Sequence, residues 1–131
     1  MIINDAEIIA EVGREVDAYE AALMANDVAA LDAFFWASPH TIRYGVAENL
    51  YGFDEIAAFR VGRSGGSPPR ERIRTEIVAI GVDAAVAHVE FTRADTGRNG
   101  RQTQTWIRTL DGWRIVSAHV SLRQDGADQR K

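Results

Sequence analysis

The second half of the chain is divided by turn signals into four runs of alternating apolar and polar residues. The runs lie near residues 72–80, 84–94, 101–110 and 113–122, and the turns contain Gly81, Gly97 to Gly100 and Asp111-Gly112. Alternation with a period of two predicts β-strands, and Asp-Gly is a strong signal for a tight hairpin. The sequence therefore predicts a meander of antiparallel strands, whose apolar face must be covered by other elements.

The Asp111-Gly112 turn also predicts which side chains share a face of the last hairpin. A two-residue loop there pairs Leu110 with Trp113, and each step away from the turn pairs the next two residues. One face of the hairpin then carries Trp106, Trp113, Ile115, Gln104, His119 and Ser121. Bulky aromatic rings fill space against helices, so we predict that this face points inward.

The opposite face of the hairpin is flat and largely apolar. It carries Thr103, Thr105, Ile107, Val116, Ala118, Val120 and Leu122. A contiguous apolar patch is rarely left in water, and a flat surface of small side chains suits packing against another sheet. We therefore predict a homodimer formed through this face.

The first half of the chain predicts three helices and a short strand. One apolar stripe at steps of three and four contains Ile8, Val12, Val16, Tyr19 and Leu23. Asn26-Asp27 then caps a second helix, which Ser38-Pro39 ends. After a strand around residue 43, a third helix opens at Gly52 and carries Phe59 inward, with Arg60 and Arg63 near its end. Helices packed on one face of a curved antiparallel sheet give an α+β fold, as a single domain over residues 1–131.

Arg43 and Tyr19 are the candidate functional residues. Arg43 follows the aromatic helix end Phe34-Phe35-Trp36, and a guanidinium taken out of water needs an anionic partner. That partner is either a ligand or one of the chain's own carboxylates, and the sequence leaves both open. Tyr19 lies on the buried stripe, where its hydroxyl needs a hydrogen-bond partner from the backbone or from a ligand.

Composition excludes several classes of function. The chain has no cysteine, which excludes disulfides, thiol catalysis and cysteine-ligated zinc. Its net charge is −4 with both signs interspersed, so no surface for nucleic acid is expected. No apolar run reaches membrane-spanning length, and residues 1–5 do not resemble a secretory signal. We therefore expect a cytoplasmic protein without membrane contact.

No metal ion or organic cofactor is predicted. His88 and Glu90 are spaced like two ligands on one strand face. Val89 and Phe91 are the bulkier, inward alternates, so His88 and Glu90 are expected to face outward or into the dimer contact. The glycine-rich and arginine-rich loop at residues 62–70 lacks the phosphate-loop lysine signature and precedes a strand. We interpret this loop as a lid or rim of a pocket.

The order of elements resembles the NTF2-like, or SnoaL-like, cone (cystatin-like) fold, whose members enclose a pocket between helices and sheet. The closing run from Gly112 to Ser121 looks like the last strand of that superfamily. A narrower resemblance, to the AtzH-like family, is carried by Tyr19 to Leu23, Asn26-Asp27, Phe35-Trp36, Pro39, Thr41, Arg43, Gly45, Phe59-Arg60, Gly100 to Trp106 and His119 to Ser121. It covers nearly the whole chain, from about Tyr19 to Leu122.

The AtzH-like resemblance implies an activity. The namesake of that family is a decarboxylating amidohydrolase of cyanuric-acid degradation that acts on an N-carboxylated urea, and its required tyrosine and arginine match Tyr19 and Arg43. We therefore expect metal-free and cofactor-free hydrolysis of a substrate like 1,3-dicarboxyurea. Arg43 would bind a carboxylate through a forked pair of hydrogen bonds, and Tyr19 would transfer a proton. The expected substrate-binding residues are Trp36, Phe59, Gln104, His119 and Ser121.

Two other classes of function stay open from the sequence. One is a non-catalytic carboxylate-binding or assembly module, because NTF2-like domains such as the association domain of a calcium/calmodulin-dependent kinase use basic pockets without turnover. The other is a SnoaL-like lyase, cyclase or isomerase, which needs an acidic general base in the cavity. Glu76 and Glu90 could serve only if a bulge reversed the strand parity.

Overall fold

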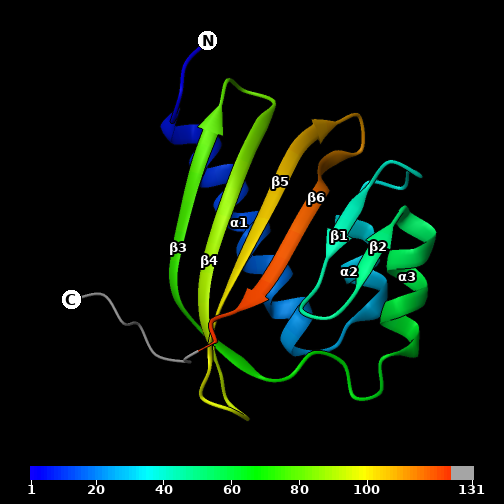
Figure 1. The fold of residues 1–131 in the computed structure, drawn as a ribbon. Coiled ribbons are helices and arrows are strands. Elements are labelled where there is room, and N and C mark those ends of the chain that lie inside the picture. The colour runs from blue at the N-terminus through cyan, green and yellow to red at the C-terminus, as the bar shows by residue number, and fades with distance from the viewer. Residues whose placement is uncertain (125–131) are drawn as a thin grey trace.

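The chain folds with its helices first and its long strands last (Figure 1). The structure is a computed structural model, and it describes residues 1–124. Within that range the elements are α1 (Ala6–Met24), α2 (Val28–Phe34), β1 (Ile42–Tyr44), β2 (Asn49–Tyr51), α3 (Phe53–Gly62), β3 (Arg70–Ile80), β4 (Ala84–Arg93), β5 (Asn99–Thr109) and β6 (Gly112–Leu122). The predicted helices and the predicted meander of four long strands are both present.

The strands form one curved six-stranded sheet in the order β2-β1-β6-β5-β4-β3. Neighbouring strands are antiparallel except β1 and β6, which run parallel. In Figure 1, α1 runs across one face of the long strands, while α2 and α3 lie beside β1 and β2. Helices packed on one face of a curved sheet confirm the predicted α+β fold class.

The apolar stripe of α1 forms much of the core, as predicted. Asp5 caps the helix, because its side chain accepts hydrogen bonds from the backbone N–H groups of Glu7 and Ile8. All five residues of the predicted stripe are buried, together with Trp106 and Ile115 of the sheet. The burial of this stripe fixes which face of α1 meets the sheet, and it carries Tyr19 into the interior.

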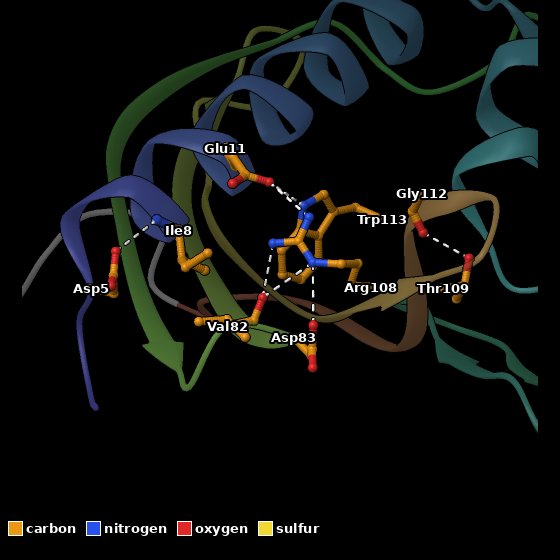
Figure 2. Close-up of polar contacts among 9 residues, drawn as sticks. All are labelled: Asp5, Ile8, Glu11, Val82, Asp83, Arg108, Thr109, Gly112 and Trp113. Carbon is orange, nitrogen blue, oxygen red and sulfur yellow. Dashed lines mark hydrogen bonds and ion pairs between the residues drawn. The ribbon is translucent and has the colours of Figure 1, made fainter. Parts of the chain in front are cut away.

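A polar cluster joins the first half of α1 to the ends of the long strands (Figure 2). Glu11 Oε1 accepts hydrogen bonds from Trp113 Nε1 and from Arg108 Nη1, both at 3.0 Å. The Arg108 guanidinium also covers the Trp113 ring, with its Cζ atom 4.6 Å from the ring centroid, and donates to the Val82 carbonyl. The bond from Trp113 and then the bond from Arg108 hold the pKa of the Glu11 carboxyl below its ordinary value.

The turn between β5 and β6 differs from the predicted one. Thr109 pairs with Gly112, so the two loop residues are Leu110 and Asp111, and Arg108 pairs with Trp113. Gly112 has φ 106°, a conformation that favours glycine. The Thr109 hydroxyl donates to the Gly112 carbonyl at 2.7 Å and accepts from the Asp111 N–H at 3.1 Å. These bonds stabilise the turn one residue earlier than the Asp-Gly signal indicated.

A bulge at Val116 reverses the faces in the second half of β6. Trp106 pairs with Ile115 but Thr105 pairs with Ser117, which leaves Val116 as the extra residue. The predicted inward face is correct for Trp106, Trp113 and Ile115, all of which are buried. Beyond the bulge the prediction is wrong, because Ala118 is buried whereas His119 is exposed. His119 and Ser121 therefore belong to the outer face.

Glu11 provides a test of the cluster in Figure 2. We expect Glu11→Gln to lower the midpoint of thermal unfolding by a few degrees at neutral pH, because the charged form of Glu11 makes the bonds to Trp113 and Arg108. A lowered carboxyl pKa gives stability that is present above the unfolded-state pKa and lost as the pH falls through the folded-state pKa. The difference from wild type should therefore vanish in acid.

The measurement is thermal unfolding followed from neutral pH down to about pH 3. Glu15→Gln is the matched control, since Glu15 lies one turn further along α1 and has no polar partner within residues 1–124. Equal losses of thermal stability in the two variants would contradict the role given to Glu11.

Candidate functional site

The structure contains a cavity of about 210 Å³ between the last turns of α1, the end of α3 and the inner face of the sheet. Its wall includes the turn between β1 and β2 and the loop that follows α3. The polar and aromatic lining residues include Tyr19, Arg43, Glu48, Phe59, Arg63 and Gln102. Ser67 and Pro68 of the glycine-rich loop also line it, consistent with the prediction that this loop forms the rim of a pocket.

Tyr19 contributes a buried phenol to the cavity. The side chain is 4% exposed, and its ring packs edge-on against Phe34 and Phe35, with centroids 5.7 and 6.3 Å away. No residue of the described range 1–124 makes a hydrogen bond with its hydroxyl. Tyr19 lines the cavity, so this unpartnered hydroxyl is available to a ligand there.

Arg43 reaches the cavity from β1, where it pairs with the inward-facing Ala118 of β6. Its Nη1 donates to Glu48 Oε1 at 3.1 Å, and its Cζ lies 5.7 Å from the centroid of the Phe59 ring. The side chain is 12% exposed. The sequence left open whether the anionic partner of Arg43 is a ligand or one of the chain's own carboxylates. In the structure Arg43 is paired with one of the chain's own carboxylates, that of Glu48.

Glu48 reaches Arg43 because the chain has a glycine at position 45. A Cβ atom built on Gly45 would lie 1.6 Å from Glu48 Oε1, so any larger residue would displace the carboxylate. Glu48 sits in the turn between β1 and β2, and its side chain is 25% exposed. One bond to Arg43 uses only part of a guanidinium that carries five N–H donors.

Arg63 is the cavity residue that the sequence interpretation missed. It follows the last turn of α3, where a cation is favourable for the helix dipole alone, and no spacing signal marks it as functional. Its Cζ lies 5.4 Å from the centroid of Phe59. Its Nε is buried and has no hydrogen-bond partner among the described residues. Burial, and then the charge of Arg43, lower the pKa of the Arg63 guanidinium.

A buried ion pair closes the other wall of the cavity. Arg70 of β3 donates from Nε and Nη2 to the two carboxylate oxygens of Glu20 on α1, at 2.9 and 2.6 Å. The same Nη2 donates to Gln102 Oε1 at 3.1 Å, and the guanidinium covers the Phe91 ring at 4.2 Å. Arg70 is therefore paired with a carboxylate within the protein, and it joins α1 to β3, β4 and β5.

The cavity brings together three of the seven residues that the sequence predicted for the site. Tyr19, Arg43 and Phe59 line it. Gln104 is inward as predicted, but it accepts a bond from Trp106 Nε1 at 3.2 Å and is not among the lining residues; Gln102 takes its place. Trp36 lies beyond α2, at a separate surface hollow.

The expected inward positions of His119 and Ser121 are wrong. The bulge at Val116 turns both side chains to the outer face, where His119 packs edge-on against Tyr44 at 5.7 Å between ring centroids. Val120 and Leu122 line the cavity in their place. The wall formed by β6 is consequently apolar, whereas the sequence predicted a polar one.

His88 and Glu90 are exposed on the outer face, as expected, while Val89 and Phe91 are buried. Within residues 1–124, no group of three or more His, Asp or Glu side chains is placed to hold a metal ion. The helices of this range are also too short or too polar to cross a membrane.

Solved structures define the class of protein. The chain is similar to a protein of unknown function from Pectobacterium atrosepticum, with 48% identity, a TM-score of 0.89, and 93% of this chain and 95% of that chain covered. A cystatin-like fold protein from Burkholderia xenovorans has 44% identity and a TM-score of 0.88, with 93% and 96% covered. An NTF2-like superfamily protein from Salmonella enterica has 23% identity and a TM-score of 0.73, with 96% and 99% covered. The fold is therefore the NTF2-like, or cystatin-like, fold.

The family is more specific than the fold. The sequence model of the AtzH-like family matches residues 1–126, so the chain belongs to the AtzH-like family. A search of curated proteins gave no significant match.

The buried ion pair generates a prediction about stability. Glu20→Gln leaves the Arg70 guanidinium buried without its carboxylate, so we expect the free energy of unfolding to fall by about 3–5 kcal/mol. Denaturant titration followed by circular dichroism measures this loss.

Replacing both partners is the control. Glu20→Leu combined with Arg70→Met removes the two charges together and should lose much less stability than Glu20→Gln. If Glu20→Gln were as stable as wild type, the ion pair between Glu20 and Arg70 would not hold α1 to the sheet.

Proposed function

We propose that the protein is a metal-free and cofactor-free decarboxylating amidohydrolase, and that the cavity binds a small N-carboxylated urea or amide similar to 1,3-dicarboxyurea. One observation carries this proposal: the Tyr19 hydroxyl has no hydrogen-bond partner within residues 1–124, and Tyr19 lines the same cavity as Arg43. A proton-transfer group and a cation at one small cavity are the two groups that removal of a carboxylate needs. Membership of the AtzH-like family supports the same chemistry.

Arg43 binds the substrate through its charge and its planar fork. An incoming carboxylate or urea oxygen takes the guanidinium N–H groups that Glu48 leaves free, or displaces Glu48 from Nη1. The cation then stabilises the negative charge that develops on the urea oxygen as the bond to the carboxyl group weakens. Phe59 provides an apolar surface beside this position.

Tyr19 supplies the proton in the bond-breaking step. The bond between the urea nitrogen and the carboxyl carbon breaks, and its electron pair stays on the nitrogen. The nitrogen takes the proton of the Tyr19 hydroxyl, carbon dioxide leaves, and water returns a proton to the phenolate. One proton is consumed for each carbon dioxide released, so the charges balance.

The Arg43–Glu48 ion pair favours a second candidate function, a binding module without turnover. In that module the charge on Arg43 is already compensated, and a carboxylate would bind without being consumed. The isomerase alternative has less support, because Glu90 and Glu76 are exposed on strand positions away from the cavity. The carboxylate that lines the cavity, Glu48, is bound to Arg43.

Tyr19→Phe tests the catalytic proposal. The substitution keeps the ring packing against Phe34 and Phe35 but removes the hydroxyl. We expect release of carbon dioxide from 1,3-dicarboxyurea to fall by about 10²- to 10⁴-fold. Malonate binding, measured by isothermal titration calorimetry, should remain close to that of wild type.

Two controls accompany this test. Arg43→Lys keeps a positive charge but loses the fork, so binding and turnover should both fall. Wild type treated with a chelator should keep its activity. Wild-type turnover in Tyr19→Phe would rule out the proton-transfer role, and malonate binding without any consumption of carboxylated urea would favour the binding module.

We also propose a homodimer formed through the outer face of the sheet. The bulge removes Ala118, Val120 and Leu122 from the predicted interface, because they face inward. The outer face instead carries a row that crosses all six strands in register: Val78, Val86, Thr105, Ser117, Ile42 and Tyr51. Val78 and Tyr51 of this row are 38% and 52% exposed, and burial against a second sheet would remove this apolar surface from water.

Val86→Arg places a charge in the middle of this row and should convert a dimer to a monomer, as measured by sedimentation at micromolar concentration. The matched control is Val61→Arg, since Val61 is 75% exposed on α3 and lies off the sheet. A monomeric wild type would exclude the dimer.

A further inference from the structure

We propose that Arg63 is a specificity-determining residue of the cavity, and that its guanidinium binds the ligand carboxylate that Arg43 does not bind. This inference rests on the proposed function, because it assumes that the cavity takes a small ligand with two carboxylates. It assigns a role to a residue outside the Tyr19 and Arg43 pair.

The first argument is the charge balance of the cavity wall. Four arginines line the cavity, and three of them have a carboxylate partner: Arg43 with Glu48, Arg70 with Glu20 and Arg93 with Asp95. Arg63 has no such partner within residues 1–124. Among the described residues, the cavity wall therefore carries one positive charge without a carboxylate partner, that of Arg63.

The second argument is the orphaned Nε atom of Arg63. This N–H group is buried, yet it has no acceptor among the described residues. The Phe59 ring, whose centroid lies 5.4 Å from Arg63 Cζ, interacts with the face of the guanidinium. It provides no hydrogen-bond acceptor for the N–H groups at the edge of the guanidinium. Once the Arg63 side chain turns this edge toward the cavity, a ligand carboxylate would accept from Nε and from a terminal nitrogen together.

The third argument is the position of Arg63 relative to Arg43. Both guanidinium groups lie against the same Phe59 ring, at 5.4 and 5.7 Å from its centroid. Burial, and then the charge of Arg43, lower the pKa of the Arg63 guanidinium. An anion held between the two cations relieves this repulsion. Because both arginines line one cavity, we infer that a dicarboxylate in it places one carboxylate at each of them.

Glu48 sets the requirement for the second negative charge. While Glu48 remains bound to Arg43, the carboxylate cancels the charge of Arg43, and only the charge of Arg63 is left near Phe59. A monoanion bound to Arg63 balances that charge. When a ligand carboxylate displaces Glu48 from Arg43, two charges need compensation, and only a dianion supplies both. Discrimination between dicarboxylates and monocarboxylates therefore depends on Arg63.

The test is isothermal titration calorimetry of wild type, Arg63→Gln and Arg63→Lys with malonate and with acetate as probes. We expect wild type to bind malonate more tightly than acetate. Arg63→Gln should weaken malonate binding by about 10- to 100-fold, the range expected for loss of a charged hydrogen-bonded pair, and the preference for malonate should largely disappear. Arg63→Lys, which keeps the charge without the fork, should give an intermediate result.

Arg72→Gln is the control for the loss of one positive charge. Arg72 bonds to Asp17 on the outside of the protein and does not line the cavity, so this variant should bind malonate as wild type does. Thermal unfolding of each variant reports whether it is folded.

The outcomes separate this inference from the proposed function. If wild type prefers malonate and folded Arg63→Gln keeps that preference, the role of Arg63 is wrong and the proposed function stands. If wild type binds neither probe, the role of Arg63 is wrong, and release of carbon dioxide from 1,3-dicarboxyurea decides the proposed function separately. Equal weakening of malonate and acetate in Arg63→Gln would overturn the specificity role, because it would show general loss of the cavity.

Discussion

The ion pair between Glu20 and Arg70 is the contact on which the cavity depends. It is bidentate and buried, and it joins the second half of α1 to the start of β3. Gln102 of β5 and the Phe91 ring of β4 complete the surroundings of the guanidinium. Three strands are thereby held to one helix at the end of the sheet where Tyr19 lies. Removal of one partner would leave a buried charge unpaired, which is far more destabilising than removal of both.

The two ends of α1 are held in different ways. At the first half, Glu11 bonds to Trp113 and Arg108 at a partly exposed position. At the second half, the contact is buried and also forms part of the cavity wall. The buried apolar stripe fixes which face of α1 meets the sheet, and the two polar contacts hold each half of the helix in that position. The position of Tyr19 follows from this arrangement, because it lies between these two contacts on the stripe.

The sequence predicted the fold well because its signals are local. The apolar stripe of α1 and the alternation of the long strands each depend on residues close together in the chain, and both were confirmed. The wrong predictions for the last hairpin have one physical origin, which is strand register. The turn at Leu110 and Asp111 and the bulge at Val116 are set by backbone geometry in the folded sheet, and the bulge moved His119 and Ser121 to the outer face. Arg63 was missed for another reason: its lack of a carboxylate partner within residues 1–124 is a property of the folded protein alone.

The bulge at Val116 makes the character of the cavity depend on the length of one strand. Because β6 contains one residue more than its partner at this point, Val120 and Leu122 form an apolar wall beside the arginines. A relative of this protein that lacked the extra residue would present the positions of His119 and Ser121 to the ligand instead. Its cavity would gain an imidazole and a hydroxyl without any substitution. Comparison of pockets within the family therefore has to begin from strand length, since aligned residues after this position need not face the same way.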